Sequence, residues 1–173
     1  KYRPRPRLAL IHKGDFVLIE GSGIRELNCE IRVILEGYGL LPGRKPLWKD
    51  GCAVALLHRE LISGRFSPAG RNILLAGDAA GLIFPVTFEG IGPALKSGLL
   101  AAEAICEAAE HGKEASDIYL RALKPVLKTI KQLLSTQEQL DHAAVEGPLE
   151  LSNALKDAYR ETHDLFKNHR TGF

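Results

Sequence analysis

The sequence predicts an α+β fold, in which antiparallel strands precede a largely helical second half. Short β-rich runs separated by turn residues fill the first 65 residues. After residue 89, apolar residues recur at helical spacing almost to the C-terminus. With 173 residues, 45% of them hydrophobic, the chain is long enough to build a globular core.

Four strands are expected in the first 65 residues. The runs LALIH and DFVLIE flank Lys13 and Gly14, which is a typical hairpin pattern. Residues 29–36 (CEIRVILE) and 52–58 (CAVALLH) are further strand candidates, separated by a turn-rich segment. These runs together predict an antiparallel sheet with loops.

A fifth strand and a helix are expected next. Residues 72–77 (NILLAG) are apolar almost throughout, which predicts a strand buried on both faces. Pro93 suits the start of a helix, where its missing N–H costs nothing. His111 and Gly112 form a plausible end of that helix.

Two more helices follow. Ser116 is expected to cap the first of them, and Pro125 to mark its first turn or a kink. Gly147 and Pro148 should interrupt the chain before a last helix over residues 149–167. The apolar stripe of the helix that Ser116 caps repeats at helical spacing through Leu123, Leu127, Ile130 and Leu134.

The composition excludes several function classes. The net charge of +2 is too small to indicate nucleic-acid binding, and no apolar run approaches the roughly 20 residues that span a bilayer. Three cysteines without CxxC spacing are typical of reduced thiols in a cytosolic setting, and no metal site is expected. The six histidines are scattered, and we expect them at the surface.

Residues 72–102 combine one carboxylate with an unusual density of small residues. Asp78 offers an acceptor pair suited to sugar-like hydroxyls, and the small residues beside it leave room for a flat or extended ligand. Gly90, Ile91 and Gly92 would bring the free N–H groups of a helix start to the same place. From spacing alone, Asp78 could equally cap a turn between closely packed helices. The small residues beside Asp78 are Gly77, Ala79, Ala80 and Gly81.

The run NILLAGDAAGLIFPVTFEGIGPALKSGLLAAEAI resembles the second flavin-contacting motif of FAD-dependent oxidoreductases of the geranylgeranyl reductase family. That family is part of the larger aromatic-hydroxylase-like flavoprotein group. Its pattern is Gly-Asp-Ala-Ala-Gly, a proline, Glu-Gly-Ile, and then Ser-Gly and Ala-Ala on a helix. About 35 residues match this pattern.

The resemblance implies a set of FAD-binding residues. Asp78 would bond the ribityl or ribose part of FAD, and the N–H groups of Gly90 and Ile91 would face the pyrimidine edge of the flavin, where negative charge gathers on reduction. Pro85 would lie near the face of the ring. Gly77 and Gly92 complete the implied cofactor site, and no catalytic residue is identified.

Two positions indicate which branch of the flavoprotein group the sequence resembles. Gly81 stands where aromatic hydroxylases tend to carry His, which favours a reductase. Phe88 stands where the family often has Gly, so the loop beside the flavin could differ in shape and in the substrate it admits.

The family's N-terminal dinucleotide fingerprint, GxGxxG, is missing. GSGIRE begins at Gly21 but has Glu26 in place of the third Gly, and we interpret it as a turn that leads into no helix. We therefore expect the C-terminal part of a larger FAD/NAD(P)-binding-type fold. It divides into the end of a substrate-side sheet (1–65), the second half of the FAD region (66–112) and a helical tail (113–173).

By this resemblance, the parent protein would reduce C=C bonds of an isoprenoid or other lipid substrate by hydride transfer from reduced flavin. The alternatives are a flavin monooxygenase, a quinone-linked flavoprotein dehydrogenase, or a non-catalytic folded fragment without bound flavin. The electron donor would be NAD(P)H or a partner protein. The expected location is cytoplasmic, with peripheral membrane contact as an option, and the oligomeric state is open.

Overall fold

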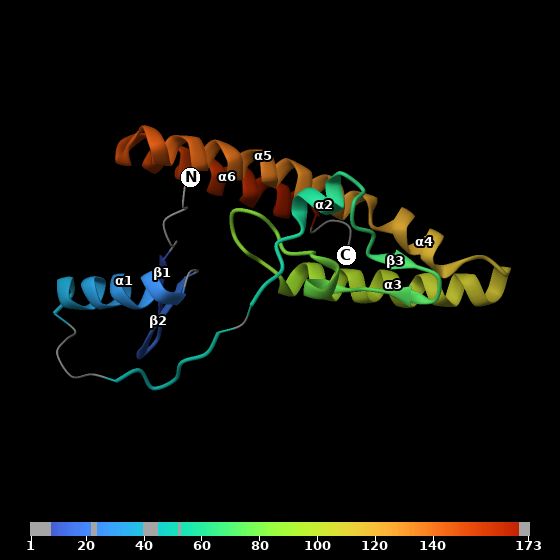
Figure 1. Cartoon of the computed structure of the whole chain (residues 1–173), viewed down its shortest axis with the longest axis horizontal. Coiled ribbons are helices and arrows are strands. Elements are labelled where there is room, and N and C mark those ends of the chain that lie inside the picture. The colour runs from blue at the N-terminus through green and yellow to red at the C-terminus, as the bar shows by residue number, and fades with distance from the viewer. Residues whose placement is uncertain (1–7, 22–23, 40–44, 52, 170–173) are drawn as a thin grey trace. The chain divides into compact units, whose positions relative to one another are not determined.

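The structure is a computed structural model that describes residues 8–21, 24–39, 45–51 and 53–169 (Figure 1). The chain forms two compact units, Lys1–Cys52 and Ala53–Phe173. The described residues form six α-helices and two small antiparallel sheets, so the fold is α+β and mostly helical.

The first unit begins with the predicted hairpin. Strands β1 (Leu8–Lys13) and β2 (Phe16–Gly21) pair antiparallel, with Lys13 opposite Phe16. Only Gly14 and Asp15 connect them, as in the tight turns that favour glycine. The hairpin prediction is confirmed.

Helix α1 (Ile24–Gly37) replaces the strand predicted over residues 29–36. Leu27, Ile31 and Ile34 are partly buried, whereas Val33 is exposed, and this three- to four-residue spacing is helical. A short apolar run fits either period, which is why the strand prediction was wrong. The helix begins three residues after β2 ends at Gly21, so GSGIRE does lead into a helix.

The strand predicted over residues 52–58 is also wrong. Residues 53–57 form no regular element, Cys52 lies outside the described residues, and His58 begins helix α2 (His58–Ile62). Leu57 accepts a hydrogen bond from the Leu61 N–H at 2.9 Å, because the backbone is already turning into the helix. Among the described residues of this region, the antiparallel sheet predicted over the first 65 residues is therefore reduced to one hairpin.

The strand predicted over residues 72–77 shrinks to β4 (Ile73–Leu74), which pairs antiparallel with β3 (Ala69–Gly70). Ile73 is 63% exposed, so burial on both faces was the wrong expectation. In the described part of the chain β4 has β3 as its only strand neighbour, and no sheet layer encloses it.

Helix α3 (Ile91–His111) follows a short 3₁₀ turn, η1 (Gly77–Ala80), and a loop. Pro93 is its third residue and Gly112 follows its last, as predicted. Helix α4 (Ala115–Ala122) begins one residue before Ser116 and has no side-chain cap. Ser116 is instead buried within the first turn, so its predicted capping role is wrong.

Helices α5 (Lys124–Glu146) and α6 (Pro148–His169) lie side by side (Figure 1). Pro125 is the second residue of α5, so the single helix predicted to follow Ser116 is divided at Leu123 into α4 and α5. Gly147 separates α5 from α6, as predicted. The predicted stripe is confirmed in part, since Leu123 and Ile130 are buried and Leu127 packs against the core, whereas Leu134 is only partly buried and its neighbour Leu133 is fully buried. Leu123, Leu127 and Ile130 join Leu82, Ala104 and Tyr119 in the main core of the second unit.

No helix among the described residues is both long enough and apolar enough to cross a membrane.

Candidate functional site

The Asp78 turn, residues Gly77–Ala80, lies between β4 and the buried residues Leu82 and Ile83. Ala76 is extended, and the 3₁₀ turn η1 follows at once. The Asp78 carbonyl accepts a hydrogen bond from the Gly81 N–H at 2.9 Å, and the Gly77 carbonyl accepts one from Leu82 at 3.1 Å. Within the turn Ala80 is buried, whereas the Asp78 side chain is exposed.

Gly77 anchors this turn beneath α3. Its φ of +56° is a backbone conformation that other residues rarely adopt, and an added Cβ would lie 2.9 Å from the Ala94 Cβ. The Gly77 N–H donates to the buried Ser97 hydroxyl at 2.9 Å, and that hydroxyl donates to the Pro93 carbonyl at 2.7 Å. The turn and the start of α3 are therefore held together.

Asp78 lies next to the first residues of α3. A Cβ placed on Gly90 would stand 3.3 Å from the Asp78 Oδ1, so the carboxylate and the helix start are in close proximity. Among the described residues, the Asp78 carboxylate and the amides of Gly90 and Ile91 have no hydrogen-bond partner. The Gly92 amide differs, since it donates to Glu89 Oε1 at 2.8 Å.

This arrangement offers complementary groups to one ligand. The carboxylate can accept hydrogen bonds from hydroxyls, and the two amides can donate to an oxygen or nitrogen that carries negative charge. The first turn of α3 has no acidic residue of its own, but the Glu89 carboxylate directly before the helix accepts from the Gly92 amide at the positive end of the helix dipole. A polar ligand that carries hydroxyls and a hydrogen-bond acceptor is the chemistry that the remaining groups fit.

The proline loop (residues 83–89) connects the Asp78 turn to α3. The Phe84 N–H donates to the Glu89 carbonyl at 2.9 Å, and the Phe88 N–H donates to the Phe84 carbonyl at 3.0 Å. Phe88 has a φ of 55°, so this position keeps a backbone conformation that glycine adopts more easily. The Pro85 side chain is fully buried here, and its place at a flavin face stays a prediction.

His58 is a site residue that the sequence reasoning missed. Its side chain is 7% exposed, and Nε2 lies 2.6 Å from the Ile83 carbonyl oxygen. Because a carbonyl only accepts, Nε2 carries the proton and donates. Burial lowers the pKa of His58, while the Ile83 bond and the Glu60 charge oppose that shift.

The surface placement predicted for the histidines is therefore wrong for His58 and holds for the four others whose side chains are described, namely His12, His111, His142 and His163. The apolar run AVALL that precedes His58 is itself mostly exposed, with Val54 42% and Leu56 51% exposed, so no local pattern in the sequence indicated that His58 is buried. Once buried, its ring N–H needs a partner, and the Ile83 carbonyl is that partner.

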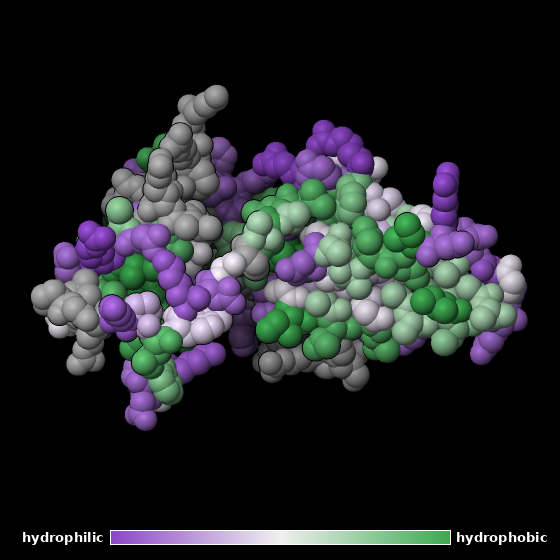
Figure 2. Space-filling view, turned by 60° about the horizontal axis from the view of Figure 1, so that its bottom comes forward, coloured by the Kyte–Doolittle hydropathy of each residue, from purple (hydrophilic) through white to green (hydrophobic). Residues whose placement is uncertain are grey.

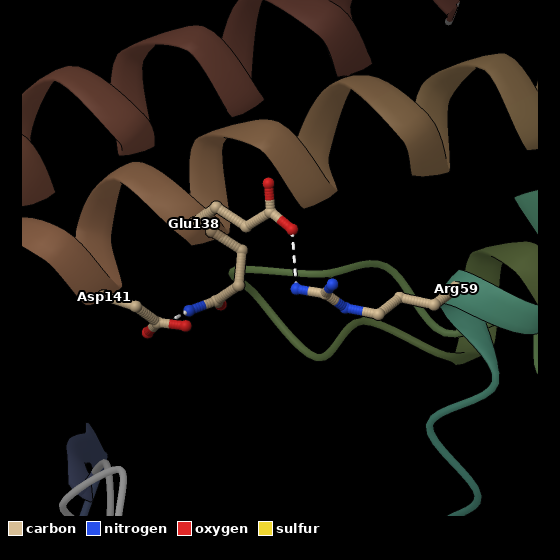
Figure 3. Close-up of polar contacts among 4 residues, drawn as sticks. Arg59, Glu138 and Asp141 are labelled. Atoms are coloured by element: carbon tan, nitrogen blue, oxygen red, sulfur yellow. Dashed lines mark hydrogen bonds and ion pairs between the residues drawn. The ribbon is translucent and has the colours of Figure 1, made fainter. Parts of the chain in front are cut away.

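Helix α5 reaches the same loop from another direction. Gln137 Oε1 accepts a hydrogen bond from the Val86 N–H at 3.3 Å, and Gln137 Nε2 donates to Asp141 Oδ1 at 2.8 Å. Beside them, Arg59 of α2 forms an exposed ion pair with Glu138 at 2.7 Å (Figure 3). The proline loop thus contacts side chains from both α2 and α5.

Tyr119 fixes the segment before the turn. It is fully buried on α4, and its hydroxyl donates to the Leu75 carbonyl at 2.6 Å. Burial raises the pKa of Tyr119, and a hydrogen bond with Ser97 opposes this shift. Helix α4 therefore holds the backbone two residues before the Gly77 turn.

One face of α3 stays exposed. Ile91, Leu95, Leu99 and Ile105 form a stripe at helical spacing, with Leu95 72% exposed, and hydrophobic side chains gather on this side of the second unit (Figure 2). The small residues of α3 differ in their packing. Ala94 lies close to Gly77, whereas a Cβ added at Gly98 would have no described atom of a neighbouring segment within 4 Å.

In the parts of the chain that the structure describes, no group of three or more His, Cys, Asp or Glu side chains could hold a metal ion. Comparisons with models of protein families, with curated proteins and with solved structures find no match to this chain. A function is therefore inferred from the residues themselves.

Proposed function

We propose that this chain is the C-terminal part of an FAD-dependent oxidoreductase of the geranylgeranyl reductase family. The observation that carries the proposal is the proximity of Asp78 to Gly90, in a stretch that resembles the flavin-contacting motif of that family. The Asp78 carboxylate and the amides of Gly90 and Ile91, which have no hydrogen-bond partner among the described residues, are the groups that we expect to contact the ligand.

The residues fit FAD by their chemistry. Asp78 would accept hydrogen bonds from ribityl or ribose hydroxyls, and the amides of Gly90 and Ile91 would donate to the pyrimidine edge of the flavin. The missing Cβ at Gly90 leaves the approach to Asp78 open. When bound, FAD would supply hydride chemistry, with the alkene of an isoprenoid or other lipid as the acceptor.

The exposed stripe of α3 agrees with a larger parent protein. Leu95 and Leu99 are exposed, and covering them with another part of the protein would stabilise the folded state by roughly 25 cal/mol per Å² of apolar area removed from water. A further part of the flavoprotein could cover them and supply the remaining FAD contacts. NAD(P)H or an electron-transfer protein would reduce the flavin, and oxygen consumption in a pyridine-nucleotide assay would instead indicate a monooxygenase.

Asp78→Ala tests the proposed cofactor site. In the full-length parent protein, this variant should lose FAD affinity by ten- to a hundredfold, since one charge-assisted hydrogen bond contributes about 1.5–3 kcal/mol. The measurement is the flavin-to-protein absorbance ratio after purification, followed by titration with FAD. The fold should persist by circular dichroism, because the Asp78 side chain is exposed.

Asp157→Ala is the matched control, because Asp157 is also an exposed carboxylate but lies on α6. It should retain wild-type flavin content. If Asp78→Ala retains full flavin content and affinity, Asp78 has no role in binding FAD and the proposal is wrong.

A further inference from the structure

Two side chains from outside the motif hold the proline loop. His58 of α2 donates to the Ile83 carbonyl at 2.6 Å in a buried position. Gln137 of α5 accepts from the Val86 N–H at 3.3 Å, 51 positions along the chain. The loop is therefore anchored near its beginning and near its middle, from two different helices.

The Val86 side chain adds apolar contacts to the second anchor. It is 7% exposed and belongs to a small buried cluster with Leu140 of α5 and Ala158 of α6. The helices that the sequence presents as a C-terminal tail thus support the loop directly.

The loop backbone is strained at the second anchor and beyond it. Val86 has a φ of 71° and Phe88 a φ of 55°, and a β-branched residue is rarely found in this left-handed region. Such conformations persist only where the surrounding contacts impose them. The loop would relax toward ordinary backbone angles if its anchors were removed.

The loop conformation also determines where α3 begins. The loop ends at Glu89, directly before Gly90, and the Glu89 carbonyl is tied back to the Phe84 N–H. A change in the loop would therefore move the Gly90 and Ile91 amides relative to Asp78.

We propose that His58 and Gln137 are positioning residues for the cofactor site. They hold the strained proline loop so that Asp78 and the amides of Gly90 and Ile91 face one ligand, although neither side chain contacts that ligand. This inference rests on the proposed FAD site, but the clamping of the loop can be tested without any flavin.

The first experiment measures amide hydrogen exchange in the 173-residue chain. His58→Leu removes the donor and keeps much of the bulk, while Gln137→Ala removes the acceptor. Each should speed exchange at the Phe84 and Phe88 amides by about two- to tenfold, as expected for one lost hydrogen bond, and leave the middle of α3 unchanged.

Two matched variants separate positioning from general loosening. His58→Gln retains an amide donor and should restore much of the slow exchange at the loop. Gln139→Ala makes the same change two residues further along α5, at an exposed side chain, and should have no effect. If His58→Leu fails to fold by circular dichroism, Gln137→Ala alone decides the result.

The second experiment measures the rate of FAD release from the full-length parent protein. His58→Leu and Gln137→Ala should speed release by about the same two- to tenfold factor, and His58→Gln and Gln139→Ala should stay near wild type. Unchanged exchange at the loop in both variants overturns the inference, and so does faster exchange without faster FAD release. Full flavin retention in Asp78→Ala would instead overturn the proposed function.

Discussion

Gly77 shows how a missing side chain sets the geometry of the Asp78 turn. Its backbone has a φ of +56°, and an added Cβ would lie 2.9 Å from the Ala94 Cβ, closer than real Cβ atoms approach. The Gly77 N–H also donates to the Ser97 hydroxyl. Backbone conformation, close approach and hydrogen bonding therefore all restrict this one position.

Gly77→Ala should lower the free energy of unfolding by about 1–3 kcal/mol, because the turn must either strain or move away from α3. Urea unfolding of the 173-residue chain measures this change. Gly98→Ala is the control, since Gly98 lies in α3 with open space around it. That substitution should stabilise the chain by about 0.5–1 kcal/mol, as Ala does in an exposed helix interior. Equal effects of the two substitutions would contradict the close contact at Gly77.

His58 makes the stability depend on pH. Burial lowers its pKa below the ordinary value of 6.5, so the unfolded chain binds the proton more readily than the folded chain. Stability should therefore fall as the pH falls through 6.5 toward the lowered pKa, and should be independent of this group above that range.

The measurement is the free energy of unfolding between about pH 7.5 and pH 5.5, for wild type and for His58→Gln. The variant should lose less stability on acidification, because its side chain does not titrate. His142→Gln, at an exposed histidine of α5, should keep the wild-type slope. Parallel slopes for wild type and His58→Gln would show that His58 titrates alike in the folded and unfolded chain.

At the scale of elements, α4 holds the segment that leads into the Asp78 turn. Tyr119 is fully buried and donates to the Leu75 carbonyl at 2.6 Å. Helix α4 also packs along α3 and against β3 (Figure 1). The short strand pair is thus supported by a helix, where an extended sheet was expected.

Tyr119→Phe should cost about 1–2 kcal/mol of stability, because the Leu75 carbonyl loses its donor while the ring packing remains. Tyr159→Phe removes a hydroxyl from a side chain that is 59% exposed and should change stability little. Urea midpoints of both variants give the comparison. Should the two variants match, the Tyr119 bond would contribute nothing to the attachment of β4.

At the scale of the whole molecule, the second unit has a core of its own while α3 leaves an apolar stripe exposed. The core joins side chains from α2, α3, α4 and α5, including Leu61, Ala104, Tyr119 and Ile130. The main core therefore does not depend on covering Leu95 or Leu99, which are exposed.

The isolated 173-residue chain should accordingly fold without binding FAD tightly. Its sequence has no dinucleotide fingerprint that would bind the adenosine diphosphate half of FAD. The proposed contacts to FAD from Asp78 and from the amides of Gly90 and Ile91 are few. Titration with FAD while flavin fluorescence is recorded should show no saturable quenching. Saturable binding at micromolar concentration or below would mean that this chain holds much more of the cofactor site than proposed.

The proximity of Asp78 to the start of α3 follows from local order along the chain. A turn of small residues, a short loop and a helix beginning near Pro93 are all predictable, because each depends on neighbouring residues. The hairpin at Gly14 and the helix ends at Gly112 and Gly147 have the same local origin. The role of these groups in binding FAD stays a prediction.

The sequence did not predict two of the elements or the contacts of one loop. Short apolar runs predicted strands over residues 29–36 and 72–77, but the structure has helix α1 and the two-residue strand β4 there. His58 and Gln137 reach the proline loop from positions 25 and 51 residues away, which no local pattern records. The sequence by itself determined where the chain turns and where its helices end, because those choices are local. Only the tertiary structure decided which side chains hold the loop, because those contacts join distant segments.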